Sequence, residues 1–260
     1  MNWYEAIYIR KSVRRYSKKA VAPALLEHIE NCAEKLNFLR DKACCSVRIY
    51  SAKEAQNKIK GFFLVNAPYY MVVFAKKTPE SLIEAGCYAE RLVLYMTTKG
   101  LGTCYQGVCQ LNAEEVPANM QTAIVIAFGY AESKMVRDER QAKRYPLSKI
   151  CHFQENAGEE IRNMLKAARM APSAMNRQPW RFMVWSDRID LYIHKDGFMQ
   201  KIAPNCQLVD VGIALCHLLE AADEQWISVS LEYDAAKQAY ARKQRGKELY
   251  YVITVKKQEN

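Results

Sequence analysis

The 260-residue sequence predicts an α+β fold that consists of two related halves in one chain. Helical and strand-like patterns are mixed along the whole chain, as α+β proteins require. A helix and a later strand also recur about 126 positions further on. The first expected strand is not followed by the string Gly-x-Gly-x-x-Gly, which marks a dinucleotide-binding Rossmann domain, so that α/β alternative is disfavoured.

The elements follow from the hydrophobic pattern. Helices are expected at residues 3–9, 23–37, 81–99, 159–170, 205–224 and 234–245. Strands are expected at residues 47–51, 69–75, 122–129, 181–185, 189–194, 226–232 and 249–256. The helix 81–99 should be central and buried in the first half, with 205–224 in the same place in the second, because small or apolar residues recur along it: Leu82, Ala85, Ala89, Leu92, Val93 and Met96.

The internal repeat rests on two pairs of segments. Residues 83–92 align with 209–218 at a shift of 126, which matches Gly86 to Gly212. The strand pattern 122–128 aligns with 249–255 at a shift of 127. Two shifts that agree within one residue predict related halves, which we place at residues 1–152 and 153–260. A chance superposition of apolar helices and strands is the alternative.

The segment from Ala171 to Phe182 combines the end of a helix, a polar turn and the start of a strand. Because each Pro disfavours a helical conformation in the residue before it, the preceding helix should end here. The turn then offers uncharged donors and acceptors that suit the edge of a pyrimidine-like ring, from Ser173, Asn176 and Gln178. The alternative is a helix-to-strand connection in which Pro and Ser only form the turn.

A second polar cluster follows the amphipathic segment 3–9. It places four cations and a hydroxyl within six residues: Arg10, Lys11, Ser12, Arg14 and Arg15. Planar guanidinium groups match phosphate oxygens in pairs, and a Ser hydroxyl adds a further donor. This cluster therefore predicts a phosphate site.

These two strings resemble the nitroreductase family of FMN-dependent oxidoreductases, whose members carry Arg-x-Ser-x-Arg-x-Tyr/Phe and Ala-Pro-Ser-x-x-Asn-x-Gln-Pro-Trp. Residues 100–107 are similar to the family's loop beside the reactive flavin nitrogen, and residues 144–147 resemble its late Arg-x-Pro-Leu segment. The resemblance implies an FMN site built from Arg10, Lys11, Ser12, Arg14, Thr103, Gln106, Gly107, Arg144, Pro172, Ser173, Asn176 and Gln178.

The resemblance also assigns roles to these residues. The phosphate would be held by Arg10, Ser12, Arg14 and Arg144, and Lys11 would lie near the phosphate or the pyrimidine side of the ring. The ring would be lined by Pro172, Ser173 and Asn176 and approached by Gln106 and Gly107. Tyr105 stands where many relatives have Trp, so the substrate pocket should differ in shape.

The order of the motifs departs from the family pattern. In the family, the Ala-Pro-Ser segment follows soon after the Arg-x-Ser-x-Arg segment, and the late Arg-x-Pro-Leu segment closes the chain. Here the Ala-Pro-Ser segment lies beyond that closing segment, and residues 36–45 contain no Pro-Ser or Gln-Pro-Trp. Each half therefore keeps a different part of the site. Family homodimers bind flavin at the subunit interface, so a tandem fusion predicts one FMN per chain and permits a monomer.

The implied activity is electron transfer from NAD(P)H to a nitroaromatic, quinone or similar acceptor by a ping-pong mechanism. No residue is assigned as a catalytic acid or base, because the chemistry belongs to the flavin. Two other classes remain: a specialised flavoenzyme on the same scaffold, such as a dehalogenase or a flavin-destroying synthase, and a protein that binds FMN without turnover.

Composition excludes several classes of function and location. The net charge is +10, but the cations are spread along the chain and no nucleic-acid motif is present; the run 137–144 is typical of a solvated helix face. Nine cysteines, an odd number, indicate free thiols and a reducing compartment, and their spacing does not favour a metal site. The longest apolar run, residues 67–75, is too short to span a bilayer. We expect a cytoplasmic enzyme that acts on small molecules, without nucleic-acid or membrane partners.

Overall fold

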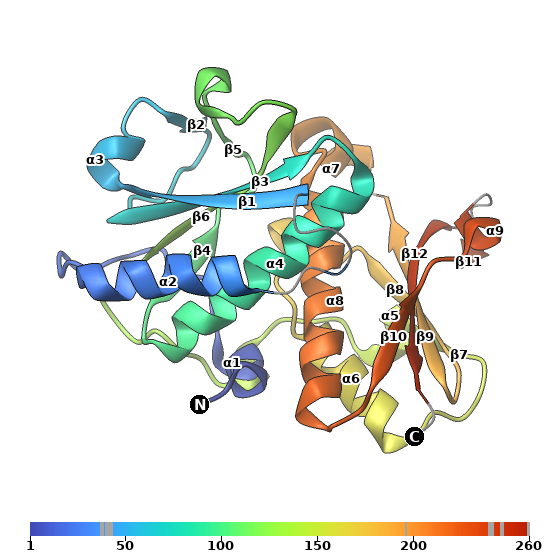
Figure 1. The fold of residues 1–260 in the computed structure, drawn as a ribbon. Coiled ribbons are helices and arrows are strands. Elements are labelled where there is room, and N and C mark those ends of the chain that lie inside the picture. The colour runs from blue at the N-terminus through green and yellow to red at the C-terminus, as the bar shows by residue number, and fades with distance from the viewer. Residues whose placement is uncertain (37–38, 40–43, 196, 239–241, 245–246, 259–260) are drawn as a thin grey trace. The chain divides into compact units, whose positions relative to one another are not determined.

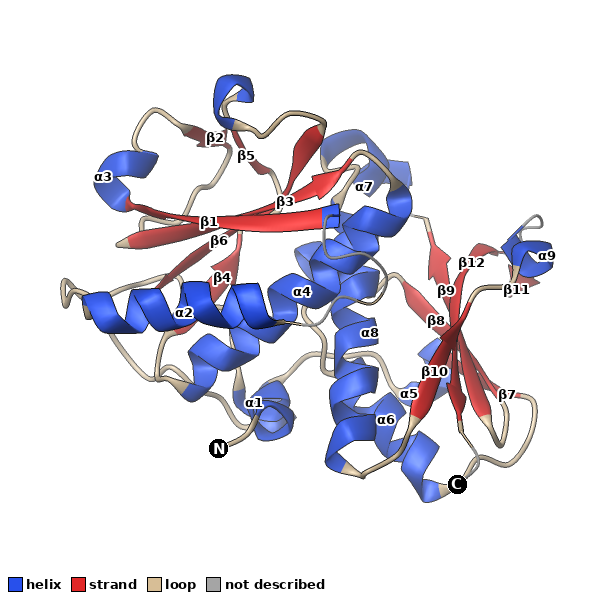
Figure 2. Ribbon diagram, in the orientation of Figure 1, coloured by secondary structure: helices blue, strands red, loops and turns tan. Residues whose placement is uncertain are grey.

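The computed structural model describes residues 1–36, 39, 44–195, 197–238, 242–244 and 247–258. The chain divides into two compact units, Met1–Ala142 and Lys143–Asn260. Each unit combines a mainly antiparallel sheet with helices, so the α+β prediction is confirmed (Figures 1 and 2). Residues 143–152, which we had placed in the first half, belong to the second unit, where β7 (Cys151–Phe153) pairs in parallel with β8 (Trp180–Val184).

The first unit is built around one four-stranded sheet. Its strands lie in the order β1-β3-β6-β4, and every neighbouring pair is antiparallel. The strands are β1 (Cys45–Ser51), β3 (Tyr69–Lys76), β4 (Gly102–Tyr105) and β6 (Met120–Gly129). The other elements are α1 (Trp3–Ile9), α2 (Pro23–Lys35), α3 (Ala52–Ala55), β2 (Ile59–Gly61), α4 (Pro79–Thr98), β5 (Cys109–Leu111) and the 3-10 turns η2 (Ala113–Glu115) and η3 (Glu139–Gln141).

Helix α4 is the core of the first unit, as predicted. It contacts the sheet, α1 and α2, and most of its side chains are buried. The other face of the sheet is covered by α3 and the β2–β5 ribbon, through a cluster that includes Tyr50, Ile59, Phe74 and Leu111 (Figure 1). The start of α4 is fixed by the Thr78 side chain, which accepts a hydrogen bond from the Ser81 N–H, and by Pro79 at the first helical position.

The second unit has a sheet in the order β10-β12-β9-β8-β7, with β11 paired to β12. The strands not yet given are β9 (Arg188–His194), β10 (Val229–Glu232), β11 (Arg242–Gln244) and β12 (Lys247–Lys257). The helices are α5 (Leu147–Ile150), α6 (Glu159–Arg169), the 3-10 turn η4 (Ala174–Asn176), α7 (Gly197–Ile202), α8 (Cys206–Glu224) and α9 (Ala235–Gln238). Buried α8 packs against α6, β8 and β9.

The two units repeat the same chain path. Each runs from a helix through two antiparallel strands to a long buried helix and then to two more strands. In the first unit the strand order is β1-β3-β6-β4, and in the second the corresponding strands lie in the order β8-β9-β12-β10, again with every pair antiparallel.

The corresponding strands β6 and β12 each carry a bulge, although not at the same position of the repeat. In the β3–β6 pair the register shifts at Ala123, which has no partner on β3. In the β9–β12 pair the register shifts at Val252, which has no partner on β9. Both bulges therefore lie on the third strand of the shared order, opposite the strand that precedes the long helix.

One predicted helix is wrong. A helix was predicted over 234–245, but α9 ends at Gln238 and Arg242–Gln244 form β11, which pairs with β12. Pairing with a neighbouring strand outweighs local helix propensity here. Residues 102–105, predicted as part of a loop, form β4 because they pair with β6. Within the described ranges, we find no helix that combines the length and the apolar character needed to cross a membrane.

Candidate functional site

In the first unit, the N-terminal cluster is held beside the β4 strand. Ser12 forms a parallel bridge with Thr103, and the Val13 N–H donates to the Thr103 carbonyl at 2.9 Å. Close approach requires Gly102, because a Cβ at that position would lie 2.6 Å from Val13 Cγ2. The structure thus brings together two predicted site segments that are about 90 residues apart in sequence.

Arg10 is the most unusual residue of this cluster. It is 2% exposed, and its Nε and Nη2 atoms have no hydrogen-bond partner among the residues that the structure describes. These two nitrogens form the edge of a guanidinium that binds an oxyanion as a fork. Arg140 shows such a fork in use, since its Nε and Nη2 donate to the Asp138 carboxylate at 3.0 and 2.7 Å. A buried charge without a partner is costly, so the Arg10 fork fits a bound anion.

Four of the predicted residues of the first unit act on the Cys104 thiol. Burial raises the pKa of Cys104, whereas the charges of Arg14 and Arg10 and hydrogen bonds with Gln106 and Ser12 act to lower it. Arg14 is exposed, and Lys11 and Ser12 are half-buried. The environment of one thiol therefore links the N-terminal cluster to the flavin-loop segment.

Gln106 has a clear structural task. Its Oε1 accepts from the Val65 N–H at 2.9 Å, and its Nε2 donates to the Cys104 carbonyl at 3.0 Å. The side chain fixes the end of β4 and leaves half-buried Gly107 as the next residue. Beside it, the Tyr105 hydroxyl donates to the Glu90 carboxylate at 2.5 Å, which ties β4 to a fully buried position of α4.

In the second unit, residues 172–178 form a strained turn. Met175, Asn176 and Gln178 have φ angles of 50°, 55° and 50°, in the left-handed region that non-glycine residues seldom occupy. Pro172 is buried, Ser173 is half-buried and Asn176 is exposed. Clustered strain of this kind is typical of ligand sites.

Hydrogen bonds maintain this turn. The Gln178 N–H donates to Ser173 Oγ at 2.9 Å, and the buried Gln178 side chain accepts from the Tyr145 N–H at 2.8 Å and donates to the Asn176 carbonyl at 3.2 Å. Next to the turn, the indole Nε1 of Trp180 is buried and has no partner in the described part of the chain. This donor is free for a further acceptor.

Arg144 lies in the second unit, and its guanidinium is engaged there. Nε and Nη2 donate to the Met170 carbonyl at 3.3 and 3.2 Å, and Nη1 donates to Asn176 Oδ1 at 3.0 Å. In Arg10 the edge formed by Nε and Nη2 has no partner among the described residues, whereas in Arg144 the same two atoms bind the carbonyl at the end of α6. Arg144 joins the helix end to the 172–178 turn.

A buried carboxyl group also supports the turn. Asp210 of α8 is 5% exposed and accepts from the Ala174 N–H at 3.1 Å through both oxygens. At the repeat-related position in the first unit, Glu84 of α4 accepts from the Leu39 N–H at 2.6 Å. In both units, the carboxyl group at this position of the long helix accepts from a backbone N–H in the segment that follows an earlier helix, α2 in the first unit and α6 in the second.

Asp210 gives a prediction about pH. Burial raises the pKa of its carboxyl well above the ordinary value of 3.8, and the bond from Ala174 only partly opposes this. As the pH rises above 3.8, the unfolded chain therefore loses this proton before the folded protein does, and the free energy of unfolding falls until the raised pKa is passed.

Asp210→Asn keeps an oxygen acceptor and carries no charge. At pH 8 it should melt a few degrees higher than the wild type, as about 1 kcal/mol would give, with the difference shrinking towards pH 4. Thermal melts of both proteins between pH 4 and 8 test this, and a constant difference across that range would contradict it.

Sequence reasoning missed Arg137. Its N–H donates to the Ile9 carbonyl at 2.8 Å, beside a bridge between Arg10 and Val136, and its Nε and Nη2 are buried without a partner among the described residues. The charged run 137–144 had indicated a solvated surface. Arg137 turns inward because residues 136–137 pair with the N-terminal segment. The sequence around Arg137 does not predict that pairing.

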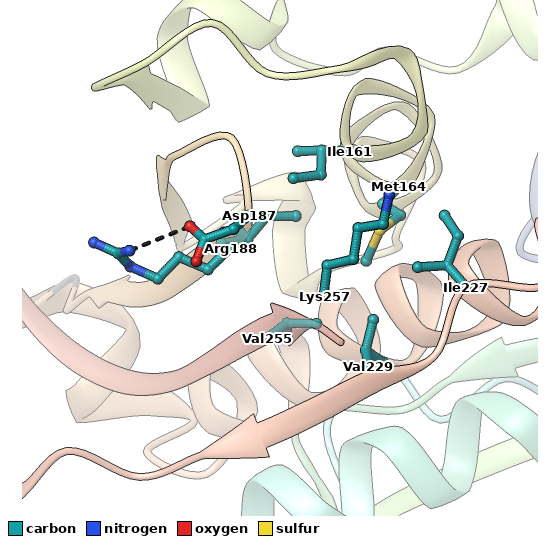
Figure 3. Close-up of a pocket in the computed structure, with 9 residues that line it drawn as sticks. Ile161, Met164, Asp187, Arg188, Ile227, Val229, Val255 and Lys257 are labelled. Atoms are coloured by element: carbon teal, nitrogen blue, oxygen red, sulfur yellow. Dashed lines mark hydrogen bonds and ion pairs between the residues drawn. The ribbon is translucent and has the colours of Figure 1, made fainter. Parts of the chain in front are cut away.

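One pocket of the second unit is unrelated to these residues. It lies between α6 and the sheet and is lined by apolar side chains such as Ile161, Met164 and Val255, with an Asp187–Arg188 ion pair of 3.2 Å at its edge (Figure 3). Its volume of about 10 Å³ admits about one water molecule. None of the predicted flavin residues lines it, so it is a small gap in the packing and not part of the flavin site.

Comparison with known proteins identifies the family. Residues 2–222 match the model of the family described as "Putative TM nitroreductase". A Thermotoga maritima structure described as a "putative nitroreductase" superposes with a TM-score of 0.66 at 23% identity, over 98% of this chain and 93% of that one. A Clostridium difficile nitroreductase family protein gives 0.50 at 24% identity, over 58% of this chain and 96% of that one. The chain belongs to this nitroreductase family and has its fold.

Two curated relatives match shorter stretches. Nitroreductase NfnB of Mycolicibacterium smegmatis is 31% identical over 94 residues, which are 34% of this chain and 40% of that protein. The "Putative NADH dehydrogenase/NAD(P)H nitroreductase" of Archaeoglobus fulgidus is 33% identical over 95 residues, which are 36% of this chain and 51% of that protein. The chain thus spans about half the length of these relatives, or less.

Proposed function

We propose that this protein is an FMN-dependent oxidoreductase that passes electrons from NAD(P)H to a nitroaromatic, quinone or similar acceptor. The observation that carries the proposal is the buried, unpartnered fork of Arg10, in a segment that matches the family's phosphate motif and is bridged to Thr103. A phosphate dianion supplies the charge and the paired oxygens that this fork lacks.

The residues of both units fit a flavin in chemical type. In the first, Arg10, Ser12 and Arg14 offer donors for a phosphate. In the second, the strained turn and the Trp180 indole N–H offer uncharged groups for a heterocycle. Bound FMN would supply the redox chemistry, while the protein binds it, orients it and sets its electrostatic surroundings.

The choice of electron donor rests on two supports. The printed name of the Archaeoglobus fulgidus relative includes NAD(P)H. The chain also has an excess of ten positive charges, which favours polyanionic dinucleotides. We propose a ping-pong reaction in which the acceptor follows the oxidised nucleotide.

We further propose that the chain is a tandem form of the family homodimer and binds one FMN. Support comes from the common strand order, the bulges at Ala123 and Val252, and the matched carboxylates Glu84 and Asp210. The phosphate motif occurs in the first unit alone and the Pro-Ser-x-x-Asn motif in the second alone, which supports a single site and a functional monomer. The free cysteines of the described chain support a reducing compartment, and we propose the cytoplasm.

The test begins with an absorbance spectrum of the purified protein. Flavin is then released and counted per chain, and NADPH and NADH are added to the holoprotein without oxygen. We expect one FMN per chain and rapid bleaching, followed by reoxidation with a nitroaromatic or quinone.

Two FMN per chain would contradict the tandem site. Bound flavin that stays oxidised would indicate a binding protein, and bleaching without reoxidation by these acceptors would indicate a specialised flavoenzyme. Failure to bind FMN after reconstitution would overturn the proposal.

A further inference from the structure

Trp226 follows the end of α8 in a backbone conformation that glycine prefers. Its φ angle is 57°, in the left-handed region. Its N–H donates to the Asp223 carbonyl at 3.0 Å, and the next N–H, from Ile227, donates to the Ala222 carbonyl at 3.0 Å. These two bonds form the Schellman motif at a helix end, in which the left-handed residue is usually Gly.

The first unit has the same helix end with a glycine in place. The shift of 126 positions between the halves aligns Gly100 with Trp226. Gly100 has a φ angle of 79°, and its N–H donates to the Thr97 carbonyl at 3.1 Å. The next N–H, from Leu101, donates to the Met96 carbonyl at 3.0 Å. The second unit therefore carries a strained aromatic residue where the first carries the residue that this turn favours.

The Trp226 side chain makes no compensating contact in its own unit. It is 93% exposed, and its ring forms no stacking or cation–π contact with the residues that the structure describes. Backbone strain at a large apolar residue that stands in solvent is unfavourable for folding. The combination is typical of a position kept for a ligand.

An open groove of about 570 Å³ lies beside this side chain. It is lined by Asp223, Trp226, Ile227, Ser228, Val229 and Gln258. Among these lining residues, Asp223 alone is charged, and its exposed carboxylate forms no hydrogen bond or ion pair with another described residue. The groove thus combines a tryptophan face with a free carboxylate, in a chain whose net charge is +10.

Both features attract a positive charge. Of the aromatic rings, indole is the best partner for an organic cation, because its face carries negative charge density. A carboxylate beside the ring adds a direct attraction between opposite charges. An anion would be repelled by Asp223, and a neutral ligand would make no use of its charge.

We propose that this groove binds a small organic cation of the alkylammonium class against the Trp226 indole and the Asp223 carboxylate. The site is separate from the strained 172–178 turn. Asp210, which supports that turn, precedes Asp223 on α8 by thirteen positions, about 20 Å along the helix axis. The proposal is therefore independent of FMN.

The test uses choline as the probe, compared with dimethylbutanol, its neutral analogue in which carbon replaces nitrogen, at constant ionic strength. The chain has four Trp residues, so their indole N–H signals can be resolved by NMR of isotope-labelled protein. The signal that Trp226→Gly lacks is that of Trp226. Choline should shift this signal saturably, and the neutral alcohol should bind about 3- to 10-fold more weakly.

Binding to variants is followed on the methyl signal of choline. Asp223→Asn should weaken choline about 3- to 10-fold. Glu224→Gln removes the neighbouring charge, which does not line the groove, and should change the affinity less than about 2-fold. Trp226→Gly should abolish saturable binding.

Melting temperatures without choline test the strain. Trp226→Gly should melt about 1 to 3 °C higher than the wild type, because glycine relieves the left-handed conformation. Gly100→Ala, at the matched position of the first unit, should melt lower and still bind choline. A Cβ at Gly100 would meet no atom within 4 Å, so this change tests the φ angle alone.

Three results would overturn the site: no saturable shift in the wild type, equal affinity for the neutral alcohol, or choline binding that survives Trp226→Gly. A lower melting temperature of Trp226→Gly would show that the indole has a structural partner, and would also overturn it. So would a Trp226 signal that moves on dilution of the protein and not with choline, because a second copy would then cover the indole.

Discussion

Replacing Arg10 with Met is expected to stabilise the flavin-free protein and, at the same time, to abolish its high affinity for FMN. Arg10 is 2% exposed and has two nitrogens without partners in the described structure, so its charge is costly when no anion is bound. Met fills a similar volume without a charge. Replacing buried ion pairs with apolar residues of similar volume is often neutral or raises the free energy of unfolding by about 1–4 kcal/mol, and we expect a gain within that range here because Arg10 has no paired charge to lose among the described residues. The same change removes a phosphate fork and should lower FMN affinity by about 100-fold.

Urea unfolding of the flavin-free proteins and FMN titration measure the two effects separately. Arg140→Met is the matched control, because the Arg140 side chain is 90% exposed and pairs with Asp138 at the surface. It should change the stability by less than about 0.5 kcal/mol and leave FMN binding intact. A flavin-free Arg10→Met protein that is less stable than the wild type would show that the fork has a structural partner.

Gln178→Leu should have the largest effect in the second unit. The Gln178 side chain is 1% exposed and bonds the Tyr145 N–H and the Asn176 carbonyl. Leu satisfies neither backbone group, and each unsatisfied group costs about 1–3 kcal/mol. We expect the free energy of unfolding to fall by about 2–5 kcal/mol and the affinities for FMN and riboflavin to fall together, since the strained turn loses its support.

Denaturant unfolding gives the stability change, and Gln200→Leu provides the comparison, because Gln200 is exposed on α7 of the same unit. That variant should stay within about 0.5 kcal/mol of the wild type. Equal losses in the two variants would mean that the Gln178 bonds contribute nothing specific.

The sequence was most informative where a local signal decides the structure. The Pro residues at 172 and 179 predict the end of α6 and the turn before β8, and the hydrophobic pattern predicts the buried helices α4 and α8. The sequence was least informative where pairing between distant segments determines the secondary structure. The strands β4, β7 and β11 exist because of their neighbours, and their own residues give weak or opposite signals.

The arginines show the same limit within the site. Arg10 is predicted from its motif, and its burial agrees with that interpretation. Arg137 and Arg144 belong to one charged run and look alike in sequence. Their surroundings differ because residue 136 pairs with residue 10, whereas Arg144 meets the carbonyl at the end of α6. The sequence alone therefore predicts a basic site, but it does not predict which of these arginines has a free guanidinium edge for an anion.

The bulges at Ala123 and Val252 lie on corresponding strands of the two units and bear on how a fused chain would accumulate change. In a symmetric dimer one codon changes both subunits, so a residue needed at either site is protected at both. In a fused chain each copy mutates alone, and one can drift wherever the other retains the function. The features still common to both units are then those that each sheet needs for its own folding. Deleting Ala123 or Val252 one at a time would test this, with the untouched unit as an internal reference.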